Sequence, residues 1–146
     1  MQIAQWSKDY EIGFPIIDQQ HQQMFALVKQ LEVLRGQEAD SATLKPILQT
    51  LLNDTIAHFT LEENLMQQHG YPFYDQHKQI HDRLTQKISK ILDYLEANED
   101  KTFVNNELSR FLHQWLVHHI QGQDRKMIQF FRDRNIVDAQ KQTIHC

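Results

Sequence analysis

Two pairs of polar residues, each set inside an apolar helical pattern, constrain the fold of this chain more than any other feature. His58 and Glu62 form one pair, and His77 and His81 form the other. Residues four apart on an α-helix differ by about 40° in direction and about 6 Å in height, so both side chains of a pair reach the same volume. Because unpartnered polar groups cost free energy in an apolar core, the pattern predicts that a metal ion satisfies them.

Apolar residues repeat with the period of an α-helix over four long stretches of the chain. We expect helices from about Asp18 to Leu34, from Asp40 or Ser41 to near Gly70, from Tyr74 to Ala97, and from near Thr102 through His119. The connections are short, which places neighbouring helices antiparallel. The sequence therefore predicts an all-α fold, an up-down-up-down antiparallel four-helix bundle, and shows no strand pattern.

A length of 146 residues suits a single domain with a sizeable core, and we expect one domain over residues 1–146. Residues 1–16 are predicted to form an irregular N-terminal arm, about 17–131 the bundle, and about 132–146 a tail. Apolar residues between Met127 and Val137 predict a short C-terminal helix.

Composition excludes several classes of site and partner. The formal charge of −4 argues against nucleic acid or an anionic membrane surface as partner. A single cysteine, Cys146, makes a Cys-based zinc site, an iron–sulfur cluster and a covalent c-type haem improbable. No apolar stretch approaches the roughly 20 residues that span a bilayer, and the N-terminus does not resemble a signal peptide. We expect a cytoplasmic protein without membrane insertion.

Nine histidines are the most unusual count in the composition. The apolar stripes of the predicted helices place six polar residues inside the bundle: His21, His58, Glu62, His77, His81 and His119. His118 lies on a stripe that is almost as apolar as that of His119, so periodicity favours His119 only slightly. His69 at a helix end, His113 off the stripe and His145 in the tail are predicted to lie outside the site.

Five histidines and one carboxylate exceed what one first-row metal ion takes while it keeps an open position. Two ions need bridging anions, and carboxylates bridge well; Glu62 is one candidate and Asp124 is the other. Asp124 follows His119 by five residues, which is a rotation of about 140° on a regular helix. It can join His119 only if the ions sit apart along the helix or the helix is distorted, for example by a π-bulge near Gly122.

Four stretches of the sequence carry a resemblance to a known family. They follow an N-terminal Trp6 and read "IDQQHQQMF", "HFTLEENLM", "YPFYDQHKQIH" and "FLHQWLVHHIQGQD". Each stretch is a weak signal, but the combined pattern H…HxxxE…HxxxH…HxxxxD is highly specific. The chain resembles the hemerythrin family, specifically its single-domain bacterial members, over nearly its whole length.

The resemblance implies a non-haem centre of two iron ions per chain with an oxo or hydroxo bridge. His77, His81 and His119 would hold one iron, and the spacing HxxxxD selects His119 over His118. The second iron would be held by His21 and His58 and keep one open position, while Glu62 and Asp124 would bridge both ions. Phe59, Trp115 and Leu116 are then expected to line an apolar dioxygen pocket.

The function implied by the resemblance is reversible dioxygen binding, for storage, delivery or scavenging. We expect a binding protein and not an enzyme. One alternative is a module that senses dioxygen or redox state and acts through a partner protein, which the sequence does not identify. Another is a di-iron peroxidase or nitric-oxide-reducing enzyme, which would need a proton donor near the open site.

Overall fold

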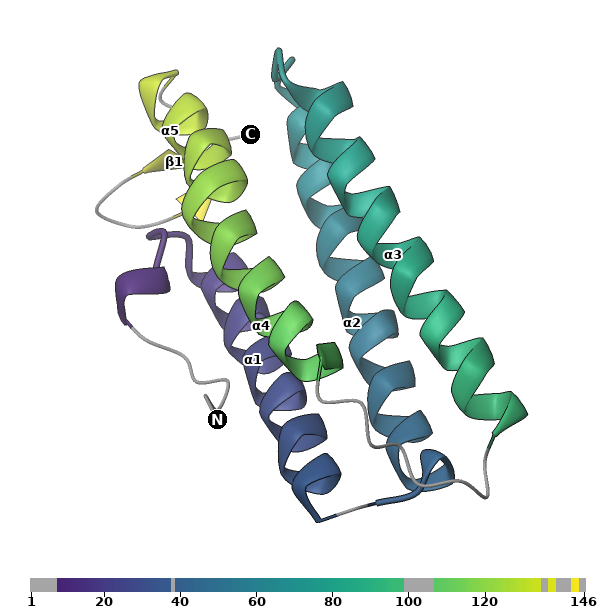
Figure 1. Cartoon of the computed structure of the whole chain (residues 1–146). Coiled ribbons are helices and arrows are strands. Elements are labelled where there is room, and N and C mark those ends of the chain that lie inside the picture. The colour runs from purple at the N-terminus through teal and green to yellow at the C-terminus, as the bar shows by residue number, and fades with distance from the viewer. Residues whose placement is uncertain (1–7, 38, 99–106, 135–136, 139–142, 145–146) are drawn as a thin grey trace.

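Four long helices form an antiparallel bundle in the computed structural model, which describes residues 8–37, 39–98, 107–134, 137–138 and 143–144. Neighbouring helices run in opposite directions, with α2 packed between α1 and α3, and α1 also packed on α4 (Figure 1). The helices are α1 Pro15–Gly36, α2 Ser41–Gln68, α3 Tyr74–Ala97 and α4 Glu107–His118. The predicted all-α, up-down-up-down bundle is confirmed.

Helix α1 begins at Pro15, three residues before the predicted start near Asp18. Proline is favoured at the first helical position because its fixed φ suits a helix and its missing N–H would have no partner there. Asp18 instead binds the segment that precedes the helix. Its carboxylate accepts hydrogen bonds from the backbone N–H groups of Ile12, Gly13 and Phe14, at 2.9 to 3.2 Å.

Helix α2 begins as the sequence predicts, at an acidic N-cap. The side chain of Asp40 accepts a hydrogen bond of 2.9 Å from the backbone N–H of Thr43, which satisfies one of the free donors at the helix start. Pro46 lies in the second turn of the helix, and α2 ends at Gln68, close to the predicted stop at Gly70.

The fourth helix differs from the prediction at both ends. Its expected start near Thr102 lies outside the described residues. At the other end α4 continues into a π-helical segment, η2 His119–Asp124, and then into α5 Arg125–Asp133. The predicted short C-terminal helix is therefore present as a continuation of the fourth helix of the bundle.

The tail contains one short pair of strands for which the sequence shows no pattern. Strands β1 Val137–Asp138 and β2 Thr143–Ile144 pair antiparallel, with Val137 opposite Ile144. Val137 was expected in the C-terminal helix, but α5 ends at Asp133. A two-residue strand is too short to produce an alternating pattern, so periodicity contains no signal for it.

In the N-terminal arm, the described part contains one turn of 3-10 helix, η1 Lys8–Tyr10, and the arm's Trp6 lies outside the described residues. Arg132 of α5 donates a hydrogen bond of 2.7 Å to the carbonyl oxygen of Ile12, which ties the arm to the C-terminal end of the bundle. Among the described residues, no helix combines the length and apolar character that crossing a bilayer requires.

Candidate metal centre

The bundle buries seven metal-ligating side chains in one place between its helices. Each of them is at most 5% exposed, in an otherwise apolar core. They come from α1, α2, α3 and the π-helical segment η2, and they are His21, His58, Glu62, His77, His81, His119 and Asp124. All seven were selected from the sequence, and the structure brings all seven together.

Three histidines form a first group. The Nε2 atoms of His81 and His119 lie 3.1 Å apart. The Nε2 of His77 lies 3.5 Å from Glu62 Oε1 and 3.1 Å from Asp124 Oδ1. These three nitrogens and two oxygens face one small volume, which suits a five-donor metal position.

Two histidines form a second group on the other side of the carboxylates. The Nε2 atoms of His21 and His58 lie 3.0 Å apart. His21 Nε2 is 3.0 Å from Asp124 Oδ2, and His58 Nε2 is 3.2 Å from Glu62 Oε2. This group offers four donors, one fewer than the first group.

Each carboxylate faces both groups, with a different oxygen toward each. Glu62 presents Oε1 to His81 at 3.2 Å and Oε2 to His58 at 3.2 Å. Asp124 presents Oδ1 to His119 and Oδ2 to His21, both at 3.0 Å. A carboxylate in this position can bridge two cations, so the arrangement suits two metal ions better than one.

Unsatisfied polar atoms support the fit to metal. All four carboxylate oxygens of Glu62 and Asp124 are buried, and they have no hydrogen-bond partner within the described part of the chain, although imidazole nitrogens lie close by. Buried polar groups are normally satisfied, and leaving one unpaired costs about 1–3 kcal/mol. Cations in the two groups would satisfy these oxygens.

The π-helical segment allows Asp124 to join the cluster. On a regular α-helix Asp124 would point about 140° away from His119. In η2 the backbone turn is wider, so residues five apart share one face, and both side chains are buried. The predicted distortion of the helix near Gly122 is confirmed.

Two residues outside the cluster orient its histidines, and sequence analysis did not identify them. Glu63 accepts a hydrogen bond of 2.9 Å from His81 Nδ1, and Gln20 accepts one from His58 Nδ1. Each bond places the ring proton on Nδ1 and leaves the Nε2 lone pair directed into the site, as metal-bound histidines require. Their long polar side chains resemble those of ordinary surface residues, so periodicity contains no signal for this role.

The imidazoles determine the charge of the carboxylates. Burial raises the pKa of Glu62, but the charge of His58 and the nearby His119 outweigh it and hold that pKa well below its usual value. Burial and the charge of Glu62 raise the pKa of Asp124, but the charge of His119 and its contact with the carboxylate outweigh both, and the pKa lies well below its usual value. Burial lowers the pKa of His119, but Asp124 raises it to about 9. A metal ion binding to His119 therefore displaces a proton.

Comparison with known proteins identifies the family. The family model described as "Hemerythrin HHE cation binding domain" matches residues 13–131. The chain belongs to the hemerythrin family. A bacteriohemerythrin of Stenotrophomonas maltophilia is 31% identical over 125 residues, which is 86% of this chain and 79% of that protein. A bacteriohemerythrin of Pseudomonas aeruginosa is 32% identical over 120 residues, 82% of this chain and 75% of that protein.

A solved structure supports the same conclusion. The crystal structure of a wild-type hemerythrin superimposes with a TM-score of 0.76 at 26% identity, covering 85% of this chain and 94% of the other. The chain is therefore a hemerythrin-family helix bundle whose buried histidines and carboxylates can hold metal.

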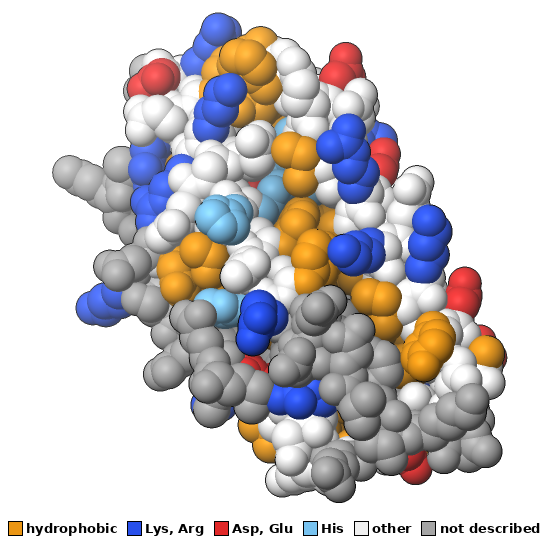
Figure 2. Space-filling view, viewed as in Figure 1, with side chains coloured by type: hydrophobic (Ala, Val, Ile, Leu, Met, Phe, Trp, Pro, Cys, Tyr) orange, Lys and Arg blue, Asp and Glu red, His pale blue; other side chains and the backbone are white. Residues whose placement is uncertain are grey.

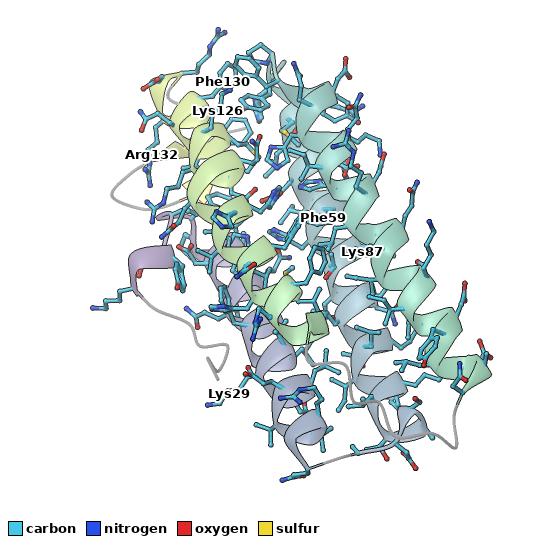
Figure 3. The ribbon with its side chains drawn as sticks, in the orientation of Figure 1. Lys29, Phe59, Lys87, Lys126, Phe130 and Arg132 are labelled. Atoms are coloured by element: carbon cyan, nitrogen blue, oxygen red, sulfur yellow. The ribbon has the colours of Figure 1, made fainter. Side chains whose placement is uncertain are left out.

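Two of the three residues expected to line a ligand pocket stack on histidines of the cluster, and the third, Leu116, lies three residues before His119 in the chain. Phe59 stacks on His81, with ring centroids 3.6 Å apart, and Figure 3 shows it in the middle of the bundle. Trp115 stacks on His119 at 4.4 Å. Leu116 is buried and, with Trp115, lines a small cavity of about 10 Å³.

Thr55 also lines that small cavity, which sequence analysis did not foresee. Its hydroxyl is buried and has no hydrogen-bond partner in the described structure. Thr55 precedes His58 by three residues and therefore shares its helix face, but a threonine in such a position is usually explained by core packing. Only the structure shows that Thr55 lines a cavity and that its hydroxyl has no hydrogen-bond partner among the described residues.

The histidines predicted to lie outside the cluster do so where they are described, although one is not at the surface. His118 is exposed, and His69 forms the C-terminal end of α2. His113 is buried, contrary to the expectation from its position off the stripe, and packs edge-on against Phe25 at 5.8 Å. His145 lies outside the described residues.

Proposed function

We propose that this chain binds dioxygen reversibly at a centre of two iron ions. His77, His81 and His119 would hold one ion, His21 and His58 the other, and Glu62 and Asp124 would bridge them. The observation that supports this proposal most is the orientation of the two carboxylates, each with one oxygen toward either histidine group. Two irons held by these residues would supply the redox chemistry that reversible dioxygen binding requires.

The protein's own residues would act on the ligand by excluding water and protons. Phe59, Trp115 and Leu116 present apolar surfaces beside the site. The second histidine group has one donor fewer than the first, which favours it as the position for an exogenous ligand. Of these three residues, Phe59 also lies near His58 of that group, with ring centroids 5.9 Å apart. An apolar surface there disfavours bond cleavage in the ligand, since cleavage requires protons.

We therefore propose a binding protein and not an enzyme. Glu63, the carboxylate that reaches His81 from outside, approaches the far nitrogen of that ring and not the interior of the site. Thr55 offers a hydroxyl near the pocket, but a hydroxyl is a much weaker acid than a carboxylic acid or a protonated imidazole. Among the described residues that line the cavity beside Leu116, none carries a carboxyl or imidazole group that could protonate a bound ligand.

The test is the visible spectrum of the iron-loaded protein. The reduced protein should develop a visible absorption band on exposure to air and lose it under argon, over repeated cycles. Elemental analysis should find two irons per chain. A single zinc per chain, or a band that never reverses, would contradict reversible dioxygen binding at two irons.

A further inference from the structure

A surface pocket lies between α3 and α4, directly outside the candidate metal centre. Its volume is about 390 Å³. Its lining includes Ile80 from α3 and Phe111, Gln114, Trp115 and His118 from α4. The pocket is distinct from the small cavity around Leu116, although Trp115 lines both.

Trp115 connects this pocket to the centre. Its half-buried indole lines the pocket and stacks nearly parallel on the imidazole of His119, with an angle of 18° between the rings. His119 itself reaches the pocket but is only 5% exposed. A molecule in the pocket can therefore contact Trp115, which lies directly against a proposed metal ligand.

Basic side chains surround the pocket. Arg83, Lys87 and Lys90 are exposed and follow Ile80 on α3 by three, seven and ten residues, which keeps them on the pocket side of the helix. The Lys87 ammonium lies 3.8 Å from the centre of the Phe111 ring. On α4, exposed Arg110 precedes Gln114 by one turn. We call Arg83, Lys87, Lys90 and Arg110 the cationic rim.

The acidic side chains that the structure describes on α3 lie elsewhere. Asp75, Asp82, Asp93 and Glu96 occupy the side of α3 turned away from α4 by the helical period. Lys78 on that side pairs with Asp82 at 3.1 Å. The sequence from Arg110 to Gln123 contains no acidic residue, although the chain as a whole carries a charge of −4. Figure 2 shows this face, with Lys and Arg side chains on both sides of a strip of hydrophobic and histidine side chains.

We propose that this face is the docking site of a small acidic electron-transfer protein that reduces the ferric centre through Trp115. The inference rests on the proposed function, because it requires an iron centre to reduce. Each ferric ion takes up one electron to become ferrous, so two one-electron donors are oxidised per centre. No bond in either protein forms or breaks.

Charge and size favour this occupant. A positive rim around an apolar pocket attracts a partner with a negative rim and raises the rate of encounter. Electron-transfer complexes are transient and bury less than about 1,200 Å², which one face of two helices can supply. The aromatic contact between Trp115 and His119 gives the electron a short route inward.

The kinetic test uses reduced plant-type [2Fe–2S] ferredoxin, an acidic one-electron donor, as probe. The ferric, iron-loaded protein is mixed with it anaerobically at low ionic strength, and loss of the ferric absorption is followed by stopped flow. The double variant Arg83→Glu/Lys90→Glu should lower the second-order rate constant about tenfold or more. Adding salt to about 0.5 M should remove most of the difference, since screening shortens the range of charge interactions.

A matched control tests whether the loss of rate comes from the cationic rim itself or from the change in net charge. Lys8→Glu/Lys29→Glu makes the same change in net charge with two exposed lysines of η1 and α1, and Lys29 lies far from Lys87 in Figure 3. This control should stay within about twofold of the unmodified protein. Both variants should bind dioxygen as before. Equal losses of rate in the two variants, or no loss in either, would overturn the proposal.

Cross-linking tests docking without electron transfer. A carbodiimide joins carboxylates of oxidised ferredoxin to lysines that touch them, and mass spectrometry locates the joined residues. Cross-links should form at Lys87 and Lys90, and cross-links that form equally at Lys29 would refute the docking site. If the protein docks ferredoxin at the rim but never shows a reversible dioxygen spectrum, the proposed function fails while the docking site stands.

Discussion

His118 and His119 are neighbours in the chain with opposite environments. His118 is exposed at the surface pocket, whereas His119 is buried against two carboxylates. We predict that His119→Ala loses iron, because its removal takes away a donor from the three-histidine group. His118→Ala should retain two irons and an unchanged spectrum. Elemental analysis and the visible spectrum of both variants provide the test, and the reverse outcome would mean that His118 is the ligand.

Thr55 has an environment in which its hydroxyl should lower the stability of the fold. It is fully buried, and its hydroxyl has no partner in the described structure. Valine has the same shape without the hydroxyl, so Thr55→Val should raise the free energy of unfolding by about 1 kcal/mol. Denaturant unfolding measures this change.

Thr85→Val is the matched control for that prediction. The hydroxyl of Thr85 donates a hydrogen bond of 3.0 Å to the carbonyl oxygen of His81. Its removal should bring no gain in stability. An equal gain in the free energy of unfolding in both variants would show that the missing hydrogen-bond partner of Thr55 is not what lowers the stability.

At the scale of the element, the π-helical segment is the feature on which the centre depends. Gly122 lies in the middle of η2, where flexibility is an obvious explanation for the distortion. The structure offers no steric reason for glycine, because a Cβ there would meet nothing within 4 Å, and its φ is not positive. The wide turn therefore follows from burial of both His119 and Asp124.

We predict that Gly122→Ala keeps the centre and stabilises the protein. Alanine in a helix costs about 0.5–1 kcal/mol less conformational free energy than glycine, so the free energy of unfolding should rise by about this amount. Iron content should stay at two per chain. Loss of iron in this variant would indicate that glycine itself is required for the wide turn.

At the scale of the whole molecule, the metal centre and the bundle should depend on each other. The buried cluster takes residues from α1, α2, α3 and η2, and its carboxylates have no other partners in the described structure. Removing metal leaves these groups unsatisfied in the core. Metal present at about 1,000 times its dissociation constant contributes about 4 kcal/mol.

We predict that chelation lowers the melting temperature by roughly 10 °C, since 1 kcal/mol corresponds to about 2–4 °C in domains somewhat larger than this one. Thermal unfolding of the loaded and the chelated protein, followed by circular dichroism, measures the shift. Reloading with iron should restore the original value. Equal melting temperatures would mean that the cluster does not hold metal in the folded protein.

Periodicity in the sequence was enough to predict the bundle and the two histidine-containing pairs of its centre, whereas the choice of His119 over His118 rested on the family resemblance. His58, Glu62, His77 and His81 could be selected because a four-residue spacing brings both members of a pair to the same face of a helix. The same period located α3 at Tyr74–Ala97 and the acidic start of α2. Such inferences depend only on residues close together in the chain.

Tertiary structure alone decided the features that join distant segments. The π-helical segment brings Asp124 to His119, and it exists because the interior of the bundle accepts both side chains together. Glu63 could be assigned to His81 only once α2 lay against α3, since these residues are 18 apart in the chain. The burial of His113 and the short β-ladder of the tail likewise depend on which segments meet in space. Local spacing predicts which side chains share a helix face, but the neighbours of that face are set by packing.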